Sequence, residues 1–367
     1  MAMKWTNILS RKKTETPKKK KTKAREWFDA IVFAVVVSTV IRGLLFSAYA
    51  IPSASMEGTE LTGDYLFVSK LSYGPRMPMT PVSIPFLESH VGGFKTFWDG
   101  VKLPYFRLPG LSKVKAGDIV VFNYPPTHDN DPVDMHTHYI KRCQGIAGDV
   151  VEIKDAQVYI NGKIMPNAPQ AQTSYHVIVN SNGINPKLLT DLHIEVTGQA
   201  GDADYIMIIP ADSYKEFKAC TGVASISPVI EPKGAQDLSV YPQSSLFNWN
   251  QDNYGPLTIP KKDWTVKLND STMALYKQAI ERYEHNIVRQ EGKDYYINNK
   301  KTGSYTFKMD YYWMMGDNRH NSSDSRYWGF VPEDHVVGKA MITWMSIDST
   351  QTPLKKIRWN RILKPIN

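Results

Sequence analysis

The stretch Gly117-Asp118-Ile119-Val120-Val121-Phe122 carries the pattern that decides the fold, a Gly-Asp pair followed by a short apolar run. Gly63-Asp64 stands in the same way before Tyr-Leu-Phe-Val, and Gly148-Asp149 before Val-Val-Glu-Ile. Glycine and aspartate favour turns, whereas short runs rich in Val, Ile, Tyr and Phe favour strands. The pairs are 54 and 31 residues apart, and this unequal spacing excludes a solenoid. The sequence therefore predicts a mainly β body with an antiparallel sheet.

Composition excludes several classes of protein. The chain has 367 residues, of which 42% are hydrophobic and 22% charged, so it is not disordered or a coiled coil over most of its length. Its two cysteines are too few for a disulfide scaffold or a four-thiolate zinc site. Cys143 and Cys220 lie 77 residues apart, and whether they pair stays open.

The net charge of +8 comes from one end of the chain. The first 26 residues contain ten Lys and Arg and two Glu, which accounts for the whole excess. A nucleic-acid binder needs basic charge on its folded body to contact phosphates. Because the remaining residues are neutral overall, we expect no nucleic-acid partner.

An apolar segment follows the basic tail. Trp27 to Tyr49 is 23 residues long, enough to span a hydrocarbon core of about 30 Å as a helix. Arg42 interrupts the segment, and near one end a long cationic side chain can reach the headgroups. We expect one uncleaved transmembrane helix that ends near Arg42.

Two further features of this segment bear on its role. Ten cations precede it, while Lys70 is the only one in the twenty residues after Ile51, which predicts a cytoplasmic N-terminus and a body outside the plasma membrane. The alternative is a cleaved signal peptide ending at Ala48-Tyr49-Ala50, a small-x-small sequence. The long basic region and Arg42 disfavour it.

The rest of the chain divides by motif content. Residues 74–110 hold six prolines and are expected to form an ordered loop. The stretch from Gly162 to about Tyr311 contains no recognisable site motif. Within it, Ser271 to His285 has the strongest helical pattern. We expect five segments: a basic cytoplasmic tail (1–26), a transmembrane anchor (27–50), the first part of a catalytic domain (51–161), an inserted mixed second domain (162–310) and the second part of the catalytic domain (311–367).

Three clusters concentrate chemically active side chains. They are Ile51-Pro52-Ser53-Ala54-Ser55-Met56 after the anchor, Tyr139-Ile140-Lys141-Arg142 on a predicted strand, and the run from Gly316 to Arg326, Gly-Asp-Asn-Arg-His-Asn-Ser-Ser-Asp-Ser-Arg. Together and in this order, the clusters resemble bacterial type I signal peptidases. These are membrane-bound serine endopeptidases that remove signal peptides from exported preproteins with a Ser/Lys dyad. The resemblance covers about half of the chain.

The resemblance implies a role for each matching residue. Ser55 would be the nucleophile, Lys141 the general base, Ser53 a donor in the oxyanion hole and Ser322 the hydroxyl that orients the lysine. Supporting positions would be Arg142, Gly316, Asp317, Asp324 and Arg326. Two residues depart from the family pattern without being catalytic: Gly58 replaces a usual Pro, and His320 a usual Asp.

The chemistry of the residues agrees with these roles. A serine hydroxyl needs a base, and a lysine is a base only when burial lowers its pKa from about 10.4 toward neutrality. On a strand, Lys141 and Tyr139 share one face while Arg142 and Ile140 share the other. Lys141 can then face Ser55 while Arg142 meets carboxylates. Taken singly, each of these residues is equally compatible with a turn hydroxyl, a solvated edge or a surface ion pair.

The substrate and partner expectations follow from the same residues. Ile51, Met56, Tyr139 and Ile140 would bind an extended substrate and accept only small side chains at the first and third positions before the cut, as in Ala-x-Ala. Partners would be secretory preproteins and plasma-membrane lipids. No metal-ligand spacing accompanies the polar loop His128 to Asp131, so we expect neither metal nor cofactor. The alternative function is a catalytically inactive, membrane-anchored peptide-binding module.

Overall fold

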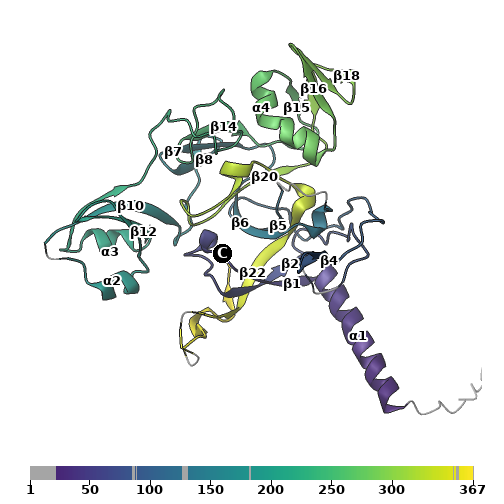
Figure 1. Ribbon diagram of the computed structural model, residues 1–367, viewed down its shortest axis with the longest axis horizontal. Coiled ribbons are helices and arrows are strands. Elements are labelled where there is room, and N and C mark those ends of the chain that lie inside the picture. Colours follow the sequence, from purple (N-terminus) through teal and green to yellow (C-terminus); the bar gives the residue numbers. More distant parts are fainter. Residues whose placement is uncertain are drawn as a thin grey trace, which may run out of the picture.

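The computed structural model describes residues 22–366 apart from positions 85, 86, 88, 126–130, 182, 350, 353 and 354. Most of the predicted basic tail and most of the predicted polar loop lie outside the described residues. Figure 1 shows a long helix, α1, that projects from a body made of several small sheets and one larger, curled sheet. The strands within each sheet pair antiparallel. The mainly β fold with one N-terminal apolar helix is thereby confirmed.

Helix α1 (Lys23–Leu44) begins where the side-chain oxygen of Thr22 accepts a hydrogen bond from the Arg25 backbone N–H. None of its residues is buried, and in the described part of the chain it is the one helix long and apolar enough to cross a membrane. The helix ends within the predicted anchor, and residues 46–50 form strand β1 instead. The strand forms because β2 pairs with it along its whole length.

The central sheet has eight strands in the order β1-β2-β22-β5-β6-β20-β21, with β23 added beside β22. Segments from both ends of the chain therefore alternate in it, and the inserted residues leave and return at its side. Its strands are β1 (Phe46–Ala50), β2 (Asp64–Ser69), β5 (Ile119–Asn123), β6 (His138–Gly145), β20 (Tyr311–Met315), β21 (Val331–Pro332), β22 (Val336–Ser346) and β23 (Lys364–Pro365).

The Gly-Asp pairs form the turns that the sequence predicts. Gly63, Gly117 and Gly148 each have φ between 90° and 94°, a left-handed conformation that favours glycine. The aspartate that follows each glycine accepts a hydrogen bond at 2.8–3.0 Å from the backbone N–H three residues earlier in the chain. This side-chain contact closes the turn and starts strands β2, β5 and β7.

The stretch 162–310 contains two separately packed parts. One is a four-stranded sheet with two short helices and its own core around Val177, Met207 and Phe217. Its elements are β10 (Gln172–Val179), α2 (Pro186–Asp191), β11 (Glu195–Gln199), β12 (Asp204–Pro210), α3 (Tyr214–Lys218) and β13 (Val223–Pro228). We call this part the β10–β13 lobe; in Figure 1 it lies at the far left.

The other part shares a core with the catalytic strands, because Tyr276 and Phe307 pack in one cluster with Trp313 of β20. It sits beside the sheet β14-β7-β8-β9 (Figure 1). Strands β7 (Val150–Lys154) and β8 (Gln157–Ile160) of that sheet precede the stretch 162–310. The elements of this part within the stretch are β9 (Lys163–Ile164), β14 (Tyr254–Thr258), β15 (Thr265–Lys267), α4 (Asp270–Gln278) with a π-helical turn (Ala279–Tyr283), β16 (Val288–Glu291), β17 (Asp294–Ile297), β18 (Lys300–Lys301) and β19 (Ser304–Thr306).

The proline-rich segment 74–110 contains no helix in its described residues, as predicted. It holds one small hairpin, β3 (His90–Val91) and β4 (Phe94–Lys95). The remaining helical elements are short. They are 3-10 turns at Ala54–Met56, Val133–Met135, Glu333–His335 and Trp359–Arg361, and helix α5 (Ser325–Trp328).

Candidate active site

Ser55 lies in the 3-10 turn that follows β1, where the chain leaves the central sheet. Its side chain is buried, and its backbone carbonyl accepts a hydrogen bond from the Asn318 backbone N–H at 3.2 Å. The Asn318 side chain donates to the neighbouring carbonyl of Ala54 at 3.3 Å. The turn is thus attached to the segment after β20, 264 residues later in the chain.

Lys141 lies on β6 and reaches this turn directly. Its Nζ donates to the Ser55 Oγ at 2.6 Å and to the Ile140 carbonyl at 3.0 Å. The Lys141 side chain also lies over the Tyr139 ring, with Nζ 5.4 Å from the ring centroid. Lys141 is 4% exposed, so the contact with the serine is shielded from water.

Burial lowers the pKa of Lys141 to about 8, and the carboxylates of Asp324 and Asp317 oppose this effect. Desolvation disfavours the ammonium form, while two nearby negative charges favour it. The balance leaves a lysine that is partly neutral just above neutral pH. A neutral amine 2.6 Å from a serine oxygen is able to accept the serine proton.

Ser53 and Ser322 take different places. The Ser53 Oγ lies 3.4 Å from the Ser55 Oγ, on the exposed side of the turn. Ser322 is buried, and its hydroxyl lowers the pKa of the Asp324 carboxyl without making a well-formed hydrogen bond. It does not bond to Lys141, whose Nζ contacts in the described residues are Ser55 and Ile140.

Two buried ion pairs frame the turn and the lysine. Arg142 donates to both oxygens of Asp317, at 2.9 Å and 2.8 Å, and Arg326 donates to both oxygens of Asp324, at 2.9 Å each. All four side chains are at most 7% exposed. Bidentate Arg-carboxylate pairs fix orientation as well as charge. As the alternation on β6 predicts, Lys141 and Arg142 point in opposite directions.

Gly316 is a point of close approach. A Cβ placed there would come within 2.4 Å of the Ser55 carbonyl oxygen and 2.2 Å of the Ser322 hydroxyl. The Gly316 N–H donates to Asp324 at 3.1 Å. A residue without a side chain is therefore needed to let the Ser55 turn rest against this segment.

The apolar residues predicted to contact substrate divide between two places. Ile51, Met56 and Ile140 pack together with Leu66 and Ala340 beside Ser55. Tyr139 does not join them, because it points to the opposite face of β6 and stacks on Tyr124 with centroids 4.5 Å apart. A second group, Tyr49, Val68, Val121 and Val337, also packs against Ile140 and continues the apolar surface away from Ser55.

Sequence reasoning missed Thr59 and Gln172. The Thr59 hydroxyl donates to Asp317 at 2.6 Å, and the Gln172 backbone bonds to the backbone of Asp317 and Arg319 at 2.9 Å. Neither residue belongs to a motif, and a backbone contact leaves no signal in residue identity. Both show that the segment after β20 is held from several sides.

The two departures from the expected motif fit their surroundings. Gly58 has φ of 96°, and a Cβ there would meet the Gln170 carbonyl oxygen at 1.9 Å. His320 accepts a hydrogen bond at Nδ1 from the Ser174 N–H, so its Nε2 donates to Asp252 at 2.9 Å. His320 thereby ties the β10–β13 lobe to the catalytic segment. Cys143 and Cys220 are both free.

Comparison with known proteins adds an independent finding. The family model described as "Signal peptidase, peptidase S26" matches residues 24–214 and 257–345. The match covers nearly all of α1, the central sheet except β23 and the end of β22, and the β10–β13 lobe as far as the start of α3.

Individual relatives agree with the family match. The chain is 27% identical to the signal peptidase I of Buchnera aphidicola subsp. Acyrthosiphon pisum, over 88% of this chain and 76% of that protein. It is 24% identical to the signal peptidase I of Pseudomonas aeruginosa, over 87% and 70%. It is 25% identical to the signal peptidase I of Rickettsia typhi, over 93% and 86%.

Proposed function

Because the chain belongs to the signal peptidase I family of serine endopeptidases, peptidase S26, we propose that it cleaves preproteins with Ser55 as nucleophile and Lys141 as general base. The observation that carries this proposal is the 2.6 Å contact between the buried Lys141 Nζ and the Ser55 Oγ. It joins a hydroxyl that needs a base to an amine whose pKa burial lowers to about 8.

The reaction follows acyl-transfer chemistry. Neutral Lys141 takes the Ser55 proton while Oγ attacks the scissile carbonyl carbon, and the resulting ammonium gives that proton to the leaving amine. The Ser53 hydroxyl, 3.4 Å from Ser55 Oγ, donates to the oxyanion that forms. A water molecule activated by Lys141 then hydrolyses the acyl-enzyme. The two buried ion pairs and Gly316 hold the Ser55 turn and the lysine in place during both steps.

Ser322 has an indirect role in this proposal. Burial raises the pKa of Asp324, but the Arg326 guanidinium lowers it overall, and the Ser322 hydroxyl adds a smaller effect in the same direction. The Asp324 charge stabilises the Lys141 ammonium, and Ser322 supports that charge. It therefore positions charge near the lysine and orients the lysine through Asp324.

The substrate binds as an added strand. In the described residues β1 pairs only with β2, and residues 138–141 of β6 pair only with β5, so each has a free edge close to Ser55. The rings of Tyr49 and His138, one on each strand, have centroids 4.8 Å apart, which brings the two strands close together. An extended peptide between them can form main-chain hydrogen bonds that do not depend on its sequence.

Small-x-small specificity follows from the apolar groups along this groove. Alternate side chains of an extended peptide point the same way, so the first and third residues before the cut face the enzyme. The first would meet Ile51, Met56 and Ile140, and the third would meet Ile140, Val121 and Val337. These side chains fill the space, so Ala fits and a larger residue is rejected.

The anchor sets where cleavage takes place. Helix α1 crosses the plasma membrane with its N-terminus in the cytoplasm, and the site lies just outside the bilayer where a signal peptide leaves it. The charge asymmetry around α1 supports this orientation.

A direct test uses the full-length chain in detergent with a preprotein that carries Ala-x-Ala before the mature sequence. Mass spectrometry should show one cut after the second Ala. Ser55→Ala should give no product, and Lys154→Ala, which changes a half-exposed lysine of β7, should cleave at the wild-type rate. Cleavage by Ser55→Ala would contradict the proposal.

A further inference from the structure

A polar site lies where β1 and β6 approach each other, beside the Tyr49 and His138 rings. It is a cavity of about 140 Å³ at the junction of α1 and the body, lined by Gly43 of α1, Tyr49, Lys70, Arg76 and His138 among others. None of these residues touches Ser55 or Lys141 in the described contacts, although Tyr49 and His138 also lie on the two strands of the proposed substrate groove. The cavity is large enough for a tetrahedral anion together with ordered water.

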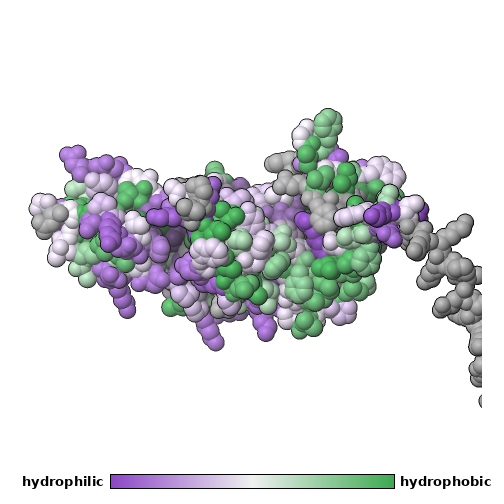
Figure 2. Space-filling view, turned by 90° about the horizontal axis from the view of Figure 1, so that it is seen from below, coloured by the Kyte–Doolittle hydropathy of each residue, from purple (hydrophilic) through white to green (hydrophobic). Residues whose placement is uncertain are grey.

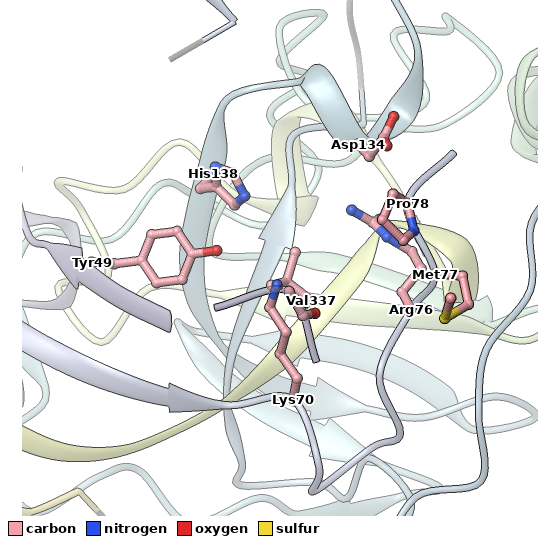
Figure 3. A pocket seen from close by; sticks show the side chains of 9 residues that line it. Tyr49, Lys70, Arg76, Met77, Pro78, Asp134, His138 and Val337 are labelled. Carbon is pink, nitrogen blue, oxygen red and sulfur yellow. Dashed lines mark hydrogen bonds between the residues drawn. The ribbon is translucent and has the colours of Figure 1, made fainter. Parts of the chain in front are cut away.

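The polar groups that face this cavity are hydrogen-bond donors. Figure 3 shows the Tyr49 hydroxyl, the Lys70 ammonium and the Arg76 guanidinium pointing into a common space, with the His138 ring above them. His138 is exposed on β6, and the nearby cations Arg76, Lys70 and Arg42 favour its neutral form, which has one N–H.

In the described residues neither Lys70 nor Arg76 forms an ion pair, although the carboxylates of Asp134 and Asp334 lie near enough to favour the Arg76 charge. Burial lowers the pKa of Lys70 to about 8, and Arg76, Arg42 and Arg107 all act in the same direction. In the part of the chain that the structure describes, Lys70 and Arg76 donate only to uncharged groups: Lys70 to the Gly43 carbonyl, and Arg76 to the Asp334 carbonyl and the Asn123 side chain.

The Asp134 carboxylate also lines the cavity, and its oxygens already accept hydrogen bonds from other groups. It accepts hydrogen bonds at 2.8 Å from the backbone N–H groups of Met79 and Thr80 and from the Thr80 hydroxyl. In Figure 3 its carboxylate turns away from the shared space. Lys70 and Arg76 are half-buried, and the carboxylates of Asp134 and Asp334 favour the Arg76 charge without forming an ion pair with it in the described residues. The hydrogen-bond donors that face the cavity therefore favour an anion there.

The position of the cavity indicates where that anion comes from. The Lys70 Nζ donates to the Gly43 carbonyl at 3.2 Å, and Gly43 is the last residue but one of α1. The cavity therefore lies at the depth where α1 leaves the bilayer. Figure 2, seen from the side on which α1 projects, shows hydrophobic side chains gathered at that end of the molecule.

The segment that continues from Arg76 adds apolar surface beside the cavity. Between positions 77 and 111 it carries large hydrophobic side chains that are more than a third exposed: Met77, Val82, Ile84, Leu87, Val91, Phe94, Trp98, Val101, Leu103, Tyr105, Phe106, Leu108 and Leu111. An anion site flanked by exposed apolar side chains at the end of a membrane helix matches a lipid with a charged headgroup and acyl chains.

We propose that this cavity binds the phosphate of a phospholipid headgroup through Lys70, Arg76 and Tyr49, and so fixes the height of the catalytic body above the bilayer. The inference rests on α1 crossing the membrane and is independent of the proposed Ser55 and Lys141 dyad. An acidic side chain on the substrate is the competing occupant. The lipid is favoured because the cavity adjoins α1 and the apolar segment.

The test is a titration of the full-length chain, in an uncharged detergent, with phosphatidylglycerol, followed by native mass spectrometry. It is carried out on Ser55→Ala as well, so that a failure of the proposed peptidase chemistry would not affect it. Two arms identify the source of the phosphate: diacylglycerol of the same chain length, which lacks the phosphate, and inorganic phosphate, which lacks the chains.

The variant Lys70→Gln/Arg76→Gln should bind phosphatidylglycerol at least roughly tenfold more weakly, since hydrogen bonds to charged groups are the strong contacts. The control Lys102→Gln/Lys113→Gln removes two exposed cations and should bind as the wild type does. Tyr49→Phe removes one oxygen from the cavity wall without altering charge and should weaken binding by a smaller factor.

Three results would overturn the proposal. The first is equal binding of phosphatidylglycerol by wild type and Lys70→Gln/Arg76→Gln. The second is binding of diacylglycerol or of inorganic phosphate as tight as that of phosphatidylglycerol. The third is displacement of the lipid only by substrate peptides that carry an acidic residue before the cut, which would assign the cavity to the substrate.

Discussion

Lys141 carries a cost to stability that is inseparable from its proposed chemistry. Lowering its pKa from 10.5 to about 8 disfavours the folded state by roughly 3 kcal/mol wherever the lysine is protonated in both states. Because the pKa is depressed on folding, this cost is absent above pH 10.5, grows as the pH falls from 10.5 to 8, and is complete below pH 8.

We therefore expect Lys141→Met to be inactive and yet harder to unfold than the wild type at pH 7, by about 1–3 kcal/mol. The gain should shrink near pH 10.5, where the wild-type lysine is neutral. Thermal unfolding of both proteins at the two pH values measures this. An equal difference at both pH values would show that the lysine is not desolvated.

The dyad itself is tested by combining substitutions. Ser55→Ala, Lys141→Ala and the double variant should all fall to nearly the same residual kcat, because residues that act as one unit are not additive. Single-turnover kinetics with a fluorogenic peptide gives the three rates. Wild-type activity in Lys141→Ala would remove the general base from the mechanism.

The pH dependence of activity follows from the same lysine. The reactive form is the neutral amine, so kcat/KM should rise with pH and level off above an apparent pKa of about 8. One pH unit below that value, activity should be about tenfold lower. A profile measured from pH 5 to 11 decides this, and an acid limb centred near 10.5 would contradict the desolvation of Lys141.

At this scale the sequence indicates some contacts and not others. The motif predicted that Ser55, Lys141, Arg142 and Asp317 belong to the site, because the role proposed for each of them requires one residue type. It did not indicate that Ser322 would sit against Gly316 and Asp324 instead of the lysine ammonium, since that depends on a side-chain rotamer.

In the central sheet, β1 and residues 138–141 of β6 each have one edge without a strand partner among the described residues, and we propose that these edges hold the substrate beside Ser55. Ile140 of β6 packs against both apolar groups along this groove. Ile140→Ala should therefore widen the groove and allow larger side chains at the third position before the cut, and to some extent at the first.

Cleavage of a peptide series with Ala, Val or Leu at each position, read by mass spectrometry, tests this prediction. A methylene group is worth roughly 1–3 kcal/mol in such pockets, so the Leu peptide should gain about tenfold or more relative to Ala. Ile178→Ala, which changes an exposed isoleucine of β10, is the control. If Leu peptides remain uncut by Ile140→Ala while Ala peptides are processed, the groove has been placed wrongly.

Elements that begin with a local signal were the predictable ones. The Gly-Asp turns before β2, β5 and β7 close on their own side chains, so residues within four positions of each other determine them. The C-terminal end of α1 was harder to predict from the sequence. Residues 46–50 continue the helix without a charged residue, and their pairing with β2 makes them a strand.

In the whole molecule, the stretch 162–310 contributes to two separate cores, one within the β10–β13 lobe and one shared with β20. Phe217 and Phe307 are matched probes, because both are phenylalanines with no more than 1% of their surface exposed. Phe217 lies in the core of the β10–β13 lobe, whereas Phe307 lies in the core that includes Trp313 of β20.

Each Phe→Ala change should cost about 3–5 kcal/mol of local stability. Phe307→Ala should also lower kcat, because β20 leads directly into the segment that holds Ser55, while Phe217→Ala should leave kcat close to that of the wild type. Limited proteolysis and activity measured on the same samples separate the two effects. Equal loss of activity in both variants would mean that the lobe is needed for catalysis.

The sequence could not separate these two parts, because neither carries a motif. Which buried aromatic residues share a core depends on long-range packing, and residues far apart in the chain, such as Tyr276 and Trp313, meet only in the folded molecule.

The pairing of β2 with β22, and of Arg142 with Asp317, has a consequence in time. A growing chain emerges from its N-terminus, so Ser55 and Lys141 are made early, but Gly316, Asp317 and the strand that completes the sheet at Ser346 are made last. In the proposed mechanism, a chain synthesised only as far as the anchor and the first part of the catalytic domain would contain Ser55 and Lys141 without the segment that holds them in place. The proposed Ser55 and Lys141 dyad would therefore become active only when synthesis of the chain is nearly complete.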